Sequence, residues 1–503
     1  MLIRLKVKGF KNLADIDVRF GPFTCIAGAN GVGKSNLFDA ITFLSALSSK
    51  SLMESARSVR DEQHRTTDVR SLFLKVGDKY VDEMSFEAEM LIPETGQDDL
   101  GQSAEASITF LQYALTLRYG NDGNSPSAER LEVTKEELRH INVSDAQRHL
   151  LFPHSSKWRQ SVVRGRRVGS PFLSTAGEGN DRRIKLHQDG RSGKPRELLA
   201  AQLPRTVLSS TNALESPTAL LARREMQAWR LLQLEPSALR KADPFSAPSH
   251  VGVDGSFLAS TLNHLAKRES GNGNSDSSCA SVGSVYARVA NQLFGLVDDV
   301  RLVGVDVDHK RELLTLQVTD RNGNVHAARA LSDGTLRFLA LAILEMDPEA
   351  PGLLCFEEPE NGIHPQRIAA MLRLLKGLCV DPDDPIGLDN PLRQVIINTH
   401  SPTVVGAVED EDLLVAEARQ MPDSKGAGRA VAFSWLSDTW RQRSSPETPT
   451  VARGVLGPYL NPLAFAEDEE DSDSREELGK TLRPPRVKDR QDLQILLPFA
   501  RDP

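Results

Sequence analysis

Apolar and polar residues alternate along the start of the chain, in LIRLKVKGF (2–10) and ADIDVRF (14–20). Alternation with a period of two is typical of strands that bury one face, so these two segments predict a β-hairpin. The apolar run FTCIAG (23–28) predicts a short buried strand that ends in a glycine-rich turn. The residues after that turn, SNLFDAITFLSALSS (35–49), have the apolar spacing of a helix.

The rest of the chain divides into segments that differ in their apolar pattern and in their composition. Strand-like alternation continues over 81–95 and 109–119. It then gives way to a stretch rich in Arg, Ser, Gly and Pro, in which residues 216–234 have helical spacing and residues 269–282 are typical of a flexible linker. Strand patterns return after residue 300, and no heptad repeat persists that would predict a long coiled coil. The predicted division is 1–145 for a first lobe, 146–284 for a basic, partly helical insertion and linker, 285–435 for a second lobe, and 436–503 for a Pro-rich and acidic tail.

Length and composition are those of a globular protein with two or three domains. The chain has 503 residues, of which 26% are charged and 39% are apolar. No run approaches the ~18 apolar residues that predict a membrane span, and the first residues lack the apolar region of a signal peptide. The four cysteines have neither metal nor disulfide spacing, and Cys25 and Cys355 lie in apolar runs. We therefore expect a cytoplasmic protein with inert core thiols.

The net charge of −8 conceals two segments of opposite sign. Residues 151–200 carry eleven Lys or Arg and four acidic residues, whereas residues 467–477 (EDEEDSDSREE) carry eight acidic residues and one Arg. The basic segment could contact nucleic-acid phosphates, or it could be a solvated loop. Its candidate contact residues are Arg159, Arg164, Arg166 and Arg167.

The most specific local motif is G-x-x-x-x-G-K-[ST], present as GANGVGKS at residues 28–35. It follows a predicted strand and opens a predicted helix, which is the context in which this motif binds nucleotide phosphates. Backbone N–H groups surround the phosphate, and the helix N-terminus adds its positive dipole. The motif predicts ATP and Mg²⁺ as cofactors, with Lys34 at the β- and γ-phosphates and Ser35 on the metal. The predicted nucleotide-binding residues of the loop are Asn30, Gly31, Gly33, Lys34 and Ser35.

A second apolar strand, GLLCFEE (352–358), ends in two adjacent carboxylates. Buried strands rarely end in paired acids unless a cation or a proton offsets the charge. Beside a phosphate loop, Glu357 is predicted to hold Mg²⁺, directly or through water. Glu358 is predicted to polarise the water that attacks the γ-phosphate.

The segment LSDGTLRF (331–338) places a Ser-Asp-Gly turn before a helix that is predicted to start near Thr335. Ser332 and Asp333 could simply cap that helix. Alternatively, Ser332, Gly334 and the helix N-terminus could grip the γ-phosphate from a second subunit, so that ATP is held between two head-to-tail protomers.

Two more polar loops follow buried segments in this half of the chain. PENGIHP (359–365) contains an Asn-Gly turn, and it could contact a second subunit or merely connect a strand to a helix. QVIINTHSP (394–402) is an apolar strand that ends in Thr-His-Ser. His400 could donate to the γ-phosphate or to the attacking water, or it could be structural.

The ordered set GANGVGKS, LSDGT, LLCFEEPENGIHP and NTHSP resembles the ABC-type ATPase heads of the SMC/RecF/OLD group. It is most similar to the stand-alone bacterial ATPases of the AAA_21 type. The resemblance covers roughly 1–145 and 285–435. It implies an α/β fold, an ABC-type P-loop ATPase head in which helices flank a mixed sheet, with an antiparallel β subdomain and a helical or irregular insertion. It also implies ATP hydrolysis by a homodimer with ATP held between two heads, or by a higher oligomer.

The resemblance assigns further site residues. LSDGT becomes the signature loop that completes the ATP site of the other subunit, residues 360–364 become the D-loop, and His400 becomes the switch histidine that is catalytic together with Glu358. Asn36 is typical of this group, and Lys11 stands where relatives often place a basic residue near the nucleotide. The implied residues outside the phosphate loop are Lys11, Asn36, Ser332, Asp333, Gly334, Asn361, His364 and His400.

Three departures from the family pattern bear on function. Relatives outside this branch have Asp at the position of Glu357. No Q-loop glutamine is evident, and Gln63 and Gln112 are the candidates. The TOPRIM nuclease domain of OLD-type relatives needs a Glu after one strand and Asp-x-Asp after another, but Glu417 lacks the following Gly and the sequence DSD lies in the acidic run. We therefore predict no nuclease activity in this chain.

The function implied by the resemblance is a nucleotide-gated dimeric sensor or scaffold in bacterial antiphage defence. Its partners would be a separate effector subunit of the nuclease or TOPRIM-like kind and nucleic acid, with no membrane. Two alternatives remain open, namely a RecF-like DNA repair or recombination ATPase and an assembly scaffold with slow, DNA-independent hydrolysis.

Overall fold

The computed structural model describes residues 1–59, 68–121, 129–190, 193–271, 278–294, 300–348, 350, 352–420, 429–444 and 450–451. They belong to one unit, Met1–Ala452. The acidic run predicted within the tail lies outside the described residues.

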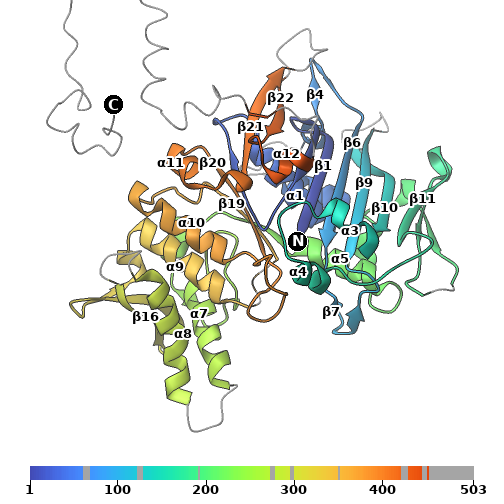
Figure 1. The fold of residues 1–503 in the computed structure, drawn as a ribbon. Coiled ribbons are helices and arrows are strands. Elements are labelled where there is room, and N and C mark those ends of the chain that lie inside the picture. Colours follow the sequence, from blue (N-terminus) through green and yellow to red (C-terminus); the bar gives the residue numbers. More distant parts are fainter. Residues whose placement is uncertain are drawn as a thin grey trace, which may run out of the picture. The chain divides into compact units, whose positions relative to one another are not determined.

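A six-stranded sheet carries the predicted phosphate loop and the acidic pair (Figure 1). Its neighbours pair in parallel, except for the two strands at one edge, which are antiparallel. The strands at Phe23–Ala27, Leu353–Glu357 and Gln394–Thr399 are buried almost throughout, which explains why their sequences are continuous apolar runs. Parallel pairing brings the carboxyl ends of the central strands to one edge of the sheet. In spatial order the strands are β14 (Trp229–Leu232), β19 (Leu353–Glu357), β20 (Gln394–Thr399), β3 (Phe23–Ala27), β21 (Leu413–Gln420) and β22 (Arg429–Ser434).

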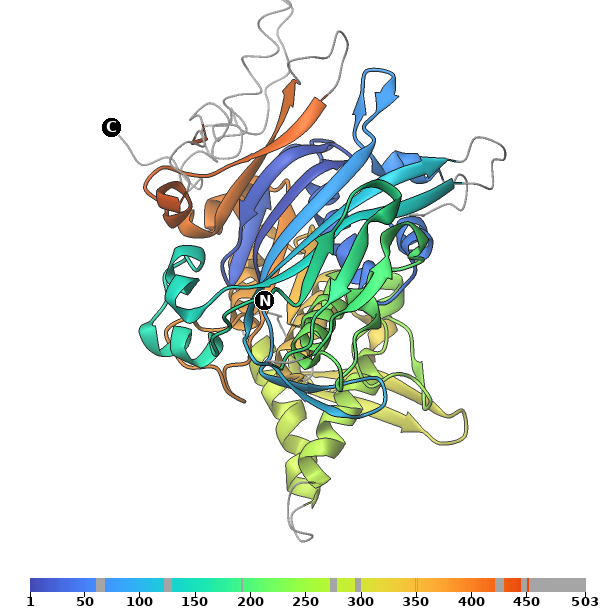
Figure 2. The same ribbon diagram turned by 90° about the vertical axis from the view of Figure 1, so that its right-hand side faces the viewer.

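The second sheet has eight antiparallel strands, which run side by side from blue to green in Figure 2. The predicted N-terminal hairpin is confirmed, with Leu5 paired to Val18 and both fully buried. In spatial order the strands are β13 (Arg196–Leu199), β12 (Arg183–Leu186), β11 (Leu173–Ala176), β10 (Glu129–His140), β9 (Phe110–Asn121), β6 (Glu83–Leu91), β1 (Leu2–Phe10) and β2 (Leu13–Arg19).

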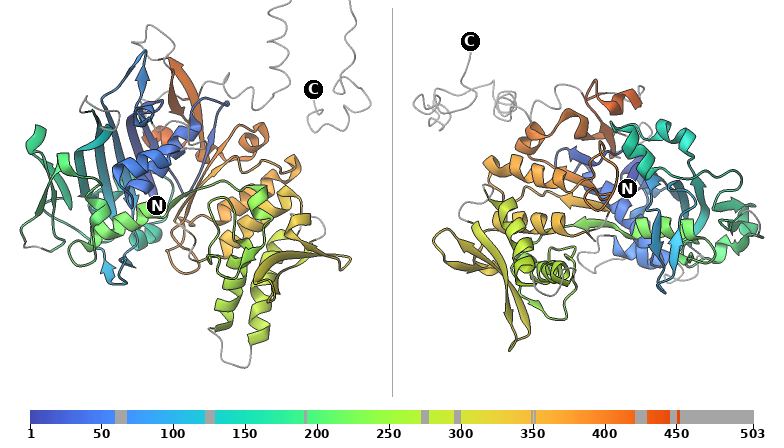
Figure 3. Two further views of the ribbon diagram at one scale, coloured as in Figure 1. Left: turned by 180° about the vertical axis from the view of Figure 1, so that it is seen from behind. Right: turned by 60° about the horizontal axis from the view of Figure 1, so that its bottom comes forward.

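Helix α1 (Lys34–Leu47) packs between the two sheets (Figure 3, left). Its Phe43 stacks on Phe10 of β1, with ring centroids 5.8 Å apart, and contacts Phe86 of β6. The helix predicted over 35–49 is confirmed, and most of its apolar side chains are buried. This packing joins the phosphate loop to the antiparallel sheet.

A helical lobe forms the other side of the unit (Figure 1). It contains α7 (Leu258–Gly271), α8 (Ser278–Leu293), α9 (Asp333–Met346) and α10 (Ile368–Gly377), with the small sheet β15 (Asp243–Pro244), β16 (Val300–Asp308), β17 (Leu313–Asp320) and β18 (Val325–Ala327). The linker prediction for 269–282 is wrong at both ends, because α7 continues to Gly271 and α8 begins at Ser278. Val285, Val289 and Leu293 form a buried stripe at helical spacing, which the Ser- and Gly-rich composition before it obscured.

The segment predicted as an insertion, 146–284, contributes to all three parts of the fold. It supplies β11–β13 to the antiparallel sheet, β14 to the parallel sheet and α7 to the helical lobe. The helical stretch predicted over 216–234 is α5 (Pro217–Gln227) followed directly by β14. Residues at the start of the predicted tail also pack on the core, where Trp440 and Arg441 are buried.

The remaining elements are short. Within the part of the chain that the structure describes, no helix has both the length and the apolarity needed to cross a bilayer. The short elements are α2 (Leu52–Ser58), α3 (Val143–His149), α4 (Ser156–Val162), α6 (Pro236–Leu239), α11 (Pro402–Ala407), α12 (Trp440–Ser444), β4 (Lys75–Val76), β5 (Lys79–Tyr80), β7 (Thr95–Gln97) and β8 (Ser103–Glu105).

Glu136 of β10 is a fully buried carboxylate. Its oxygens accept hydrogen bonds from the backbone N–H groups of Val207 (2.8 Å) and Leu208 (2.9 Å) and from the Tyr113 hydroxyl (3.1 Å). Burial raises the pKa of Glu136 to about 7, although these donors favour the ionised form. The unfolded carboxyl titrates near pH 4.5. The folded state therefore binds an extra proton between these two pH values, and stability falls as the pH rises through that window.

We expect the substitution Glu136→Gln to change this pH dependence. The free energy of unfolding of the wild type should fall relative to that of the variant by up to about 3 kcal/mol between pH 5 and pH 8, because the variant has no proton to lose. Urea denaturation at both pH values measures the difference. Glu105→Gln, at an exposed position on β8, is the control. A stability difference that is independent of pH would contradict the prediction.

Candidate nucleotide-binding site

The predicted phosphate loop joins β3 to α1 at the carboxyl edge of the parallel sheet. Gly31 and Gly33 have φ angles of +76° and +111°, which glycine adopts readily. Lys34 Nζ donates to the carbonyls of Gly28 (2.6 Å) and Ala29 (2.9 Å). Burial lowers the pKa of Lys34, and nearby carboxylates oppose that effect. The loop thus has the backbone shape and the cation that phosphate binding requires.

The turn between β1 and β2 holds the phosphate loop through Asn12. Its Nδ2 donates to the Val32 carbonyl (2.9 Å), and its Oδ1 accepts from Asn36 Nδ2 (2.7 Å). A Cβ at Gly33 would lie 2.1 Å from Asn12 Nδ2, and the φ of Gly33 is +111°, so a larger residue there would be strained and would displace the Asn12 side chain. The antiparallel sheet is therefore hydrogen-bonded to the nucleotide loop.

We expect Asn12→Ala to raise the KM for ATP by about tenfold with a smaller change in kcat. The phosphate loop loses two hydrogen bonds, each worth about 1 kcal/mol, that position it before the nucleotide arrives. Steady-state ATPase kinetics measures both constants. Asn291→Ala, at an exposed position on α8, is the control. An unaltered KM in the Asn12 variant would refute the role of this contact.

The acidic pair lies at the end of β19. Glu357 Oε2 accepts a hydrogen bond from Nε2 of Gln233 (2.9 Å), the residue that follows β14. Glu358 has a φ of +46°, which is uncommon for a residue with a side chain. Its N–H lies within hydrogen-bond distance of both the backbone oxygen (3.1 Å) and Oδ1 (3.0 Å) of Asn398 on β20. The neighbouring strand therefore holds the Glu358 backbone in this unusual conformation.

The Glu358 carboxylate has two polar partners. Its Oε2 accepts from Asn361 Nδ2 (2.9 Å), and its Oε1 lies 2.7 Å from His400 Nδ1. Partial burial acts to raise the pKa of Glu358, but these hydrogen bonds and the charge of Lys34 outweigh it and lower the pKa. Glu358 is therefore ionised at neutral pH and able to accept a proton.

A second carboxylate ties the same two loops together. Thr399 Oγ1 donates to Glu360, which is only 7% exposed, and accepts from the N–H of Ser401 (2.9 Å). Burial raises the pKa of Glu360. Glu358 thus contacts His400 while Glu360 contacts Thr399, so the loop after β19 and the loop after β20 are held together at two adjacent positions.

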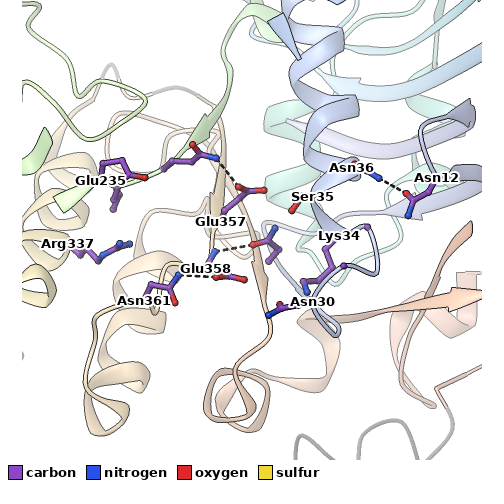
Figure 4. Close-up of a pocket in the computed structure, with 15 residues that line it drawn as sticks. Asn12, Asn30, Lys34, Ser35, Asn36, Glu235, Arg337, Glu357, Glu358 and Asn361 are labelled. Atoms are coloured by element: carbon purple, nitrogen blue, oxygen red, sulfur yellow. Dashed lines mark hydrogen bonds between the residues drawn. The ribbon is translucent and has the colours of Figure 1, made fainter. Parts of the chain in front are cut away.

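Glu357, Glu358 and Asn361 line one cavity of about 600 Å³ together with residues of the phosphate loop, whereas His400 contacts Glu358 without lining the cavity itself. Figure 4 shows Lys34 and Ser35 on one side of it, Glu357 and Glu358 facing them, and Arg337 and Glu235 on the far side. A cavity of this volume with converging polar groups is typical of a small-molecule site. The structure thus brings together two motifs that are more than 300 residues apart.

The predicted magnesium ligands fit their role. Ser35 and Glu357 both line the cavity. Hydroxyl and carboxylate oxygens are donors that Mg²⁺ prefers, together with water and phosphate oxygens.

The predicted signature loop starts α9. Ser332 Oγ accepts from the N–H of Thr335 (3.2 Å) as a helix cap, and Asp333 pairs with Arg240. None of Ser332, Asp333 and Gly334 lines the cavity of its own chain. Gly334 instead lies against the D-loop, where an added Cβ would be 3.1 Å from the Gly362 carbonyl. The signature loop and the D-loop are therefore in contact, and a role in a second subunit's site stays a prediction.

Two predicted D-loop residues differ in their contacts. Asn361 lines the cavity and bonds Glu358, as described above. His364 is exposed, and its Nδ1 accepts from the N–H of Gln366 (3.4 Å) as the cap of the short helix Pro365–Arg367. His364 is therefore available to a partner, whereas Asn361 already belongs to the site.

Neither Lys11 nor the glutamine candidate Gln112 lines the cavity. Lys11 Nζ bonds Asp39 (2.8 Å), a buried residue of α1. Gln112 lies on β9 and donates to Glu87 (2.6 Å), while Gln63 lies outside the described residues. The glutamine that lines the cavity is Gln233.

The predicted nucleic-acid arginines do not form one free patch. Arg164 is paired with Glu94 (2.6 Å). Arg167 donates to three backbone carbonyls, and its guanidinium lies 4.1 Å from the centroid of the Phe172 ring. Arg167 therefore supports the local fold, whereas the Arg164–Glu94 pair is exposed to solvent, with side chains 52% and 41% exposed. Of the other residues in this segment, Trp158 is fully buried, Arg159 is half-buried and Arg166 is exposed.

Sequence reasoning missed six residues that line the cavity, Asn12, Gln233, Leu234, Glu235, Arg337 and Asn398. Gln233 and Asn398 stand at or just after the end of an apolar strand, which is a signal that could have found them. Asn12 stands in the turn of the predicted hairpin. Arg337 lies inside a helix, and the sequence around it does not predict which site its side chain enters.

Two known protein families match parts of this chain. Residues 180–406 match the family described as "AAA domain, putative AbiEii toxin, Type IV TA system", and residues 4–152 match a family described as "AAA domain". The recognition of an ABC-type ATPase of the SMC/RecF/OLD group is confirmed by these two matches together with the partial relatives below.

Similar individual proteins match over short segments. An OLD nuclease of Thermus scotoductus is 54% identical over 41 residues, which are 8% of this chain and 8% of the relative. The DNA replication and repair protein RecF of Bacteroides thetaiotaomicron is 36% identical over 64 residues, or 12% of this chain and 17% of the relative. Each aligned segment therefore spans less than a fifth of the relative. Among solved structures, an Smc head bound to the C-terminal winged-helix domain of ScpA aligns over 86% of this chain and 98% of that chain, with 13% identity and a TM-score of 0.44.

Proposed function

We propose that this protein binds and hydrolyses MgATP and that ATP closes two copies of it into a dimer. The observation that carries the proposal is the ionised Glu358, held by His400 and Asn361, facing the phosphate loop across one cavity. The family matches support an ATPase domain.

Different residues of this chain would bind the phosphates and accept the proton. Lys34 and the loop N–H groups bind the β- and γ-phosphates, and Glu358 accepts a proton from the attacking water. His400 Nδ1 lies 2.7 Å from Glu358 Oε1 and orients that carboxylate. The same contact can stabilise the negative charge of Glu358 before it accepts the proton. Mg²⁺, held by Ser35 and Glu357, would supply charge neutralisation at the phosphates.

The position of the signature loop supports the proposed dimer. Ser332 and Gly334 do not line the cavity of their own chain, and Gly334 lies against the D-loop. In a head-to-tail dimer, Ser332 and Gly334 would contact the γ-phosphate of the ATP bound to the second protomer.

We further propose a cytoplasmic role in antiphage defence with a separate effector subunit. The toxin–antitoxin wording of the matched family and the similarity to an OLD nuclease support this role. The similarity to RecF favours a second candidate, an ATPase of DNA repair or recombination. A scaffold with slow, DNA-independent hydrolysis is the third candidate.

The test is ATP turnover with and without duplex DNA at low and moderate salt. Stimulation by DNA that fades with salt supports a nucleic-acid-coupled ATPase, because phosphate contacts release counterions. A further preference for gapped DNA favours the repair role. Slow turnover that ignores DNA favours the scaffold, and the absence of nucleotide binding contradicts the proposal itself.

Arg166 offers a clean test of nucleic-acid contact because it is exposed, whereas Arg164 is already paired with Glu94 and Arg167 supports the fold. We expect Arg166→Glu to lower DNA affinity by about tenfold at low salt, since it replaces a phosphate-binding charge with a repulsive one. Filter binding or fluorescence anisotropy measures the effect. Arg373→Glu, at an exposed position on α10, is the control. Equal affinity of the Arg166 variant and the wild type would reject this surface as a contact.

A further inference from the structure

Arg337 places a second cation in the nucleotide cavity. It lies on α9 and lines the cavity together with Glu235 and Asn361. Figure 4 shows its side chain directed into the cavity from the helical lobe, with Lys34 and Ser35 on the opposite side. Two positive side chains from two parts of the fold therefore face one another across the site.

The guanidinium of Arg337 has an unfilled hydrogen-bond capacity. Its Nε is buried and has no hydrogen-bond partner in the described part of the chain. Burial lowers the pKa of Arg337, while Asp333, Glu235 and Glu360 act in the opposite direction. An arginine keeps its charge in such surroundings. A buried charged donor without an acceptor is costly, and an anionic ligand in the cavity would supply the acceptor.

The end of the cavity at which Arg337 lies indicates which phosphate it would meet. In the proposed function, Lys34 binds the β- and γ-phosphates, and Glu358 accepts a proton from the water that attacks the γ-phosphate. Arg337 lies beyond Glu358 and Asn361 as seen from Lys34, and its side chain points toward them (Figure 4). A planar guanidinium can donate two parallel hydrogen bonds to the oxygens of a terminal phosphate.

We propose that Arg337 binds the γ-phosphate of the ATP held by its own chain and so makes the site prefer ATP over ADP. This inference rests on the proposed function. It assigns to α9, the helix that begins with the predicted signature loop, a direct contact with the nucleotide of the same subunit. Arg337 stands little more than one helical turn beyond Ser332, so the contact couples the start of α9 to the presence of the γ-phosphate.

The test compares the binding of two fluorescent nucleotides, a non-hydrolysable ATP analogue and ADP, each with Mg²⁺. For Arg337→Ala we expect about tenfold weaker binding of the ATP analogue, because a charge-assisted hydrogen bond is lost, and a change of less than about twofold for ADP. Arg337→Lys should recover part of the difference, since it keeps the charge but not the paired donors. Arg373→Ala on α10 is the matched control and should bind both nucleotides as the wild type does.

Other outcomes overturn the inference. Equal weakening of both nucleotides would show a structural role for Arg337, and unchanged binding of both would show no role. If Arg337→Ala does not fold, as judged by circular dichroism, Arg337→Gln and Arg337→Lys carry the same comparison. Failure of the proposed function looks different, because then the wild type itself would bind neither nucleotide.

Discussion

Replacing Glu358 with Gln is expected to lower kcat for ATP by about 100- to 1,000-fold, because the amide cannot accept a proton from the attacking water. The substitution keeps the size of the side chain, and one amide atom can still meet Asn361. Nucleotide affinity should change little, since the phosphate loop and Lys34 are untouched. Steady-state turnover and nucleotide titration together separate these two effects.

The same variant should accumulate an ATP-loaded dimer. Hydrolysis is the step that we expect to reopen two closed heads, so blocking it leaves them closed. Light scattering with ATP and with ADP gives the mass of the assembly. Glu178→Gln, at an exposed surface position, is the control and should turn over normally. Turnover at the wild-type rate in the Glu358 variant would remove Glu358 from the mechanism, and a monomer with ATP would remove the dimer.

The substitution Lys34→Ala should weaken both ATP and ADP binding by about 100-fold. It removes a charged donor to the phosphates, worth up to about 3 kcal/mol. It also removes the hydrogen bonds to the carbonyls of Gly28 and Ala29 that close the loop. Isothermal titration with each nucleotide measures the loss.

Comparing ATP with ADP distinguishes the effect of Lys34→Ala from that of Arg337→Ala. Lys34 meets phosphates that ADP also carries, so both affinities should fall, whereas Arg337→Ala should affect ATP alone. Lys50→Ala, just beyond the end of α1 and exposed, is the control. Nucleotide binding that survives the loss of Lys34 would mean that the cavity is not used as a P-loop site.

The local parts of the site could be predicted from the sequence. The phosphate loop needs glycines where φ is positive, and Gly31 and Gly33 meet that need within a few residues. The strand ends at Glu357 and Thr399 follow from continuous apolar runs, which buried parallel strands require. The helix start at Ser332 follows from its capping side chain. Each of these features depends on neighbours in the sequence, so the residue pattern carries it.

Composition misled the interpretation where local signals were weak. The Ser- and Gly-rich stretch after residue 269 suggested a linker, yet α8 begins at Ser278, because burial of Val285 and Val289 against neighbouring helices stabilises a helix of modest propensity. The arginines after Trp158 suggested a binding patch, yet Arg164 and Arg167 are engaged within the fold.

The sequence by itself determined the order of the motifs from which we propose the chemistry, namely a phosphate loop, a candidate metal-binding carboxylate and a candidate proton acceptor. Only the tertiary structure decided which other side chains enter that site. Gln233 reaches Glu357 because β14 pairs with β19, Asn12 reaches the phosphate loop because α1 packs against the antiparallel sheet, and Arg337 reaches the cavity from the helical lobe. These contacts join residues far apart in the chain, and their formation depends on the packing of whole sheets and helices rather than on any local pattern.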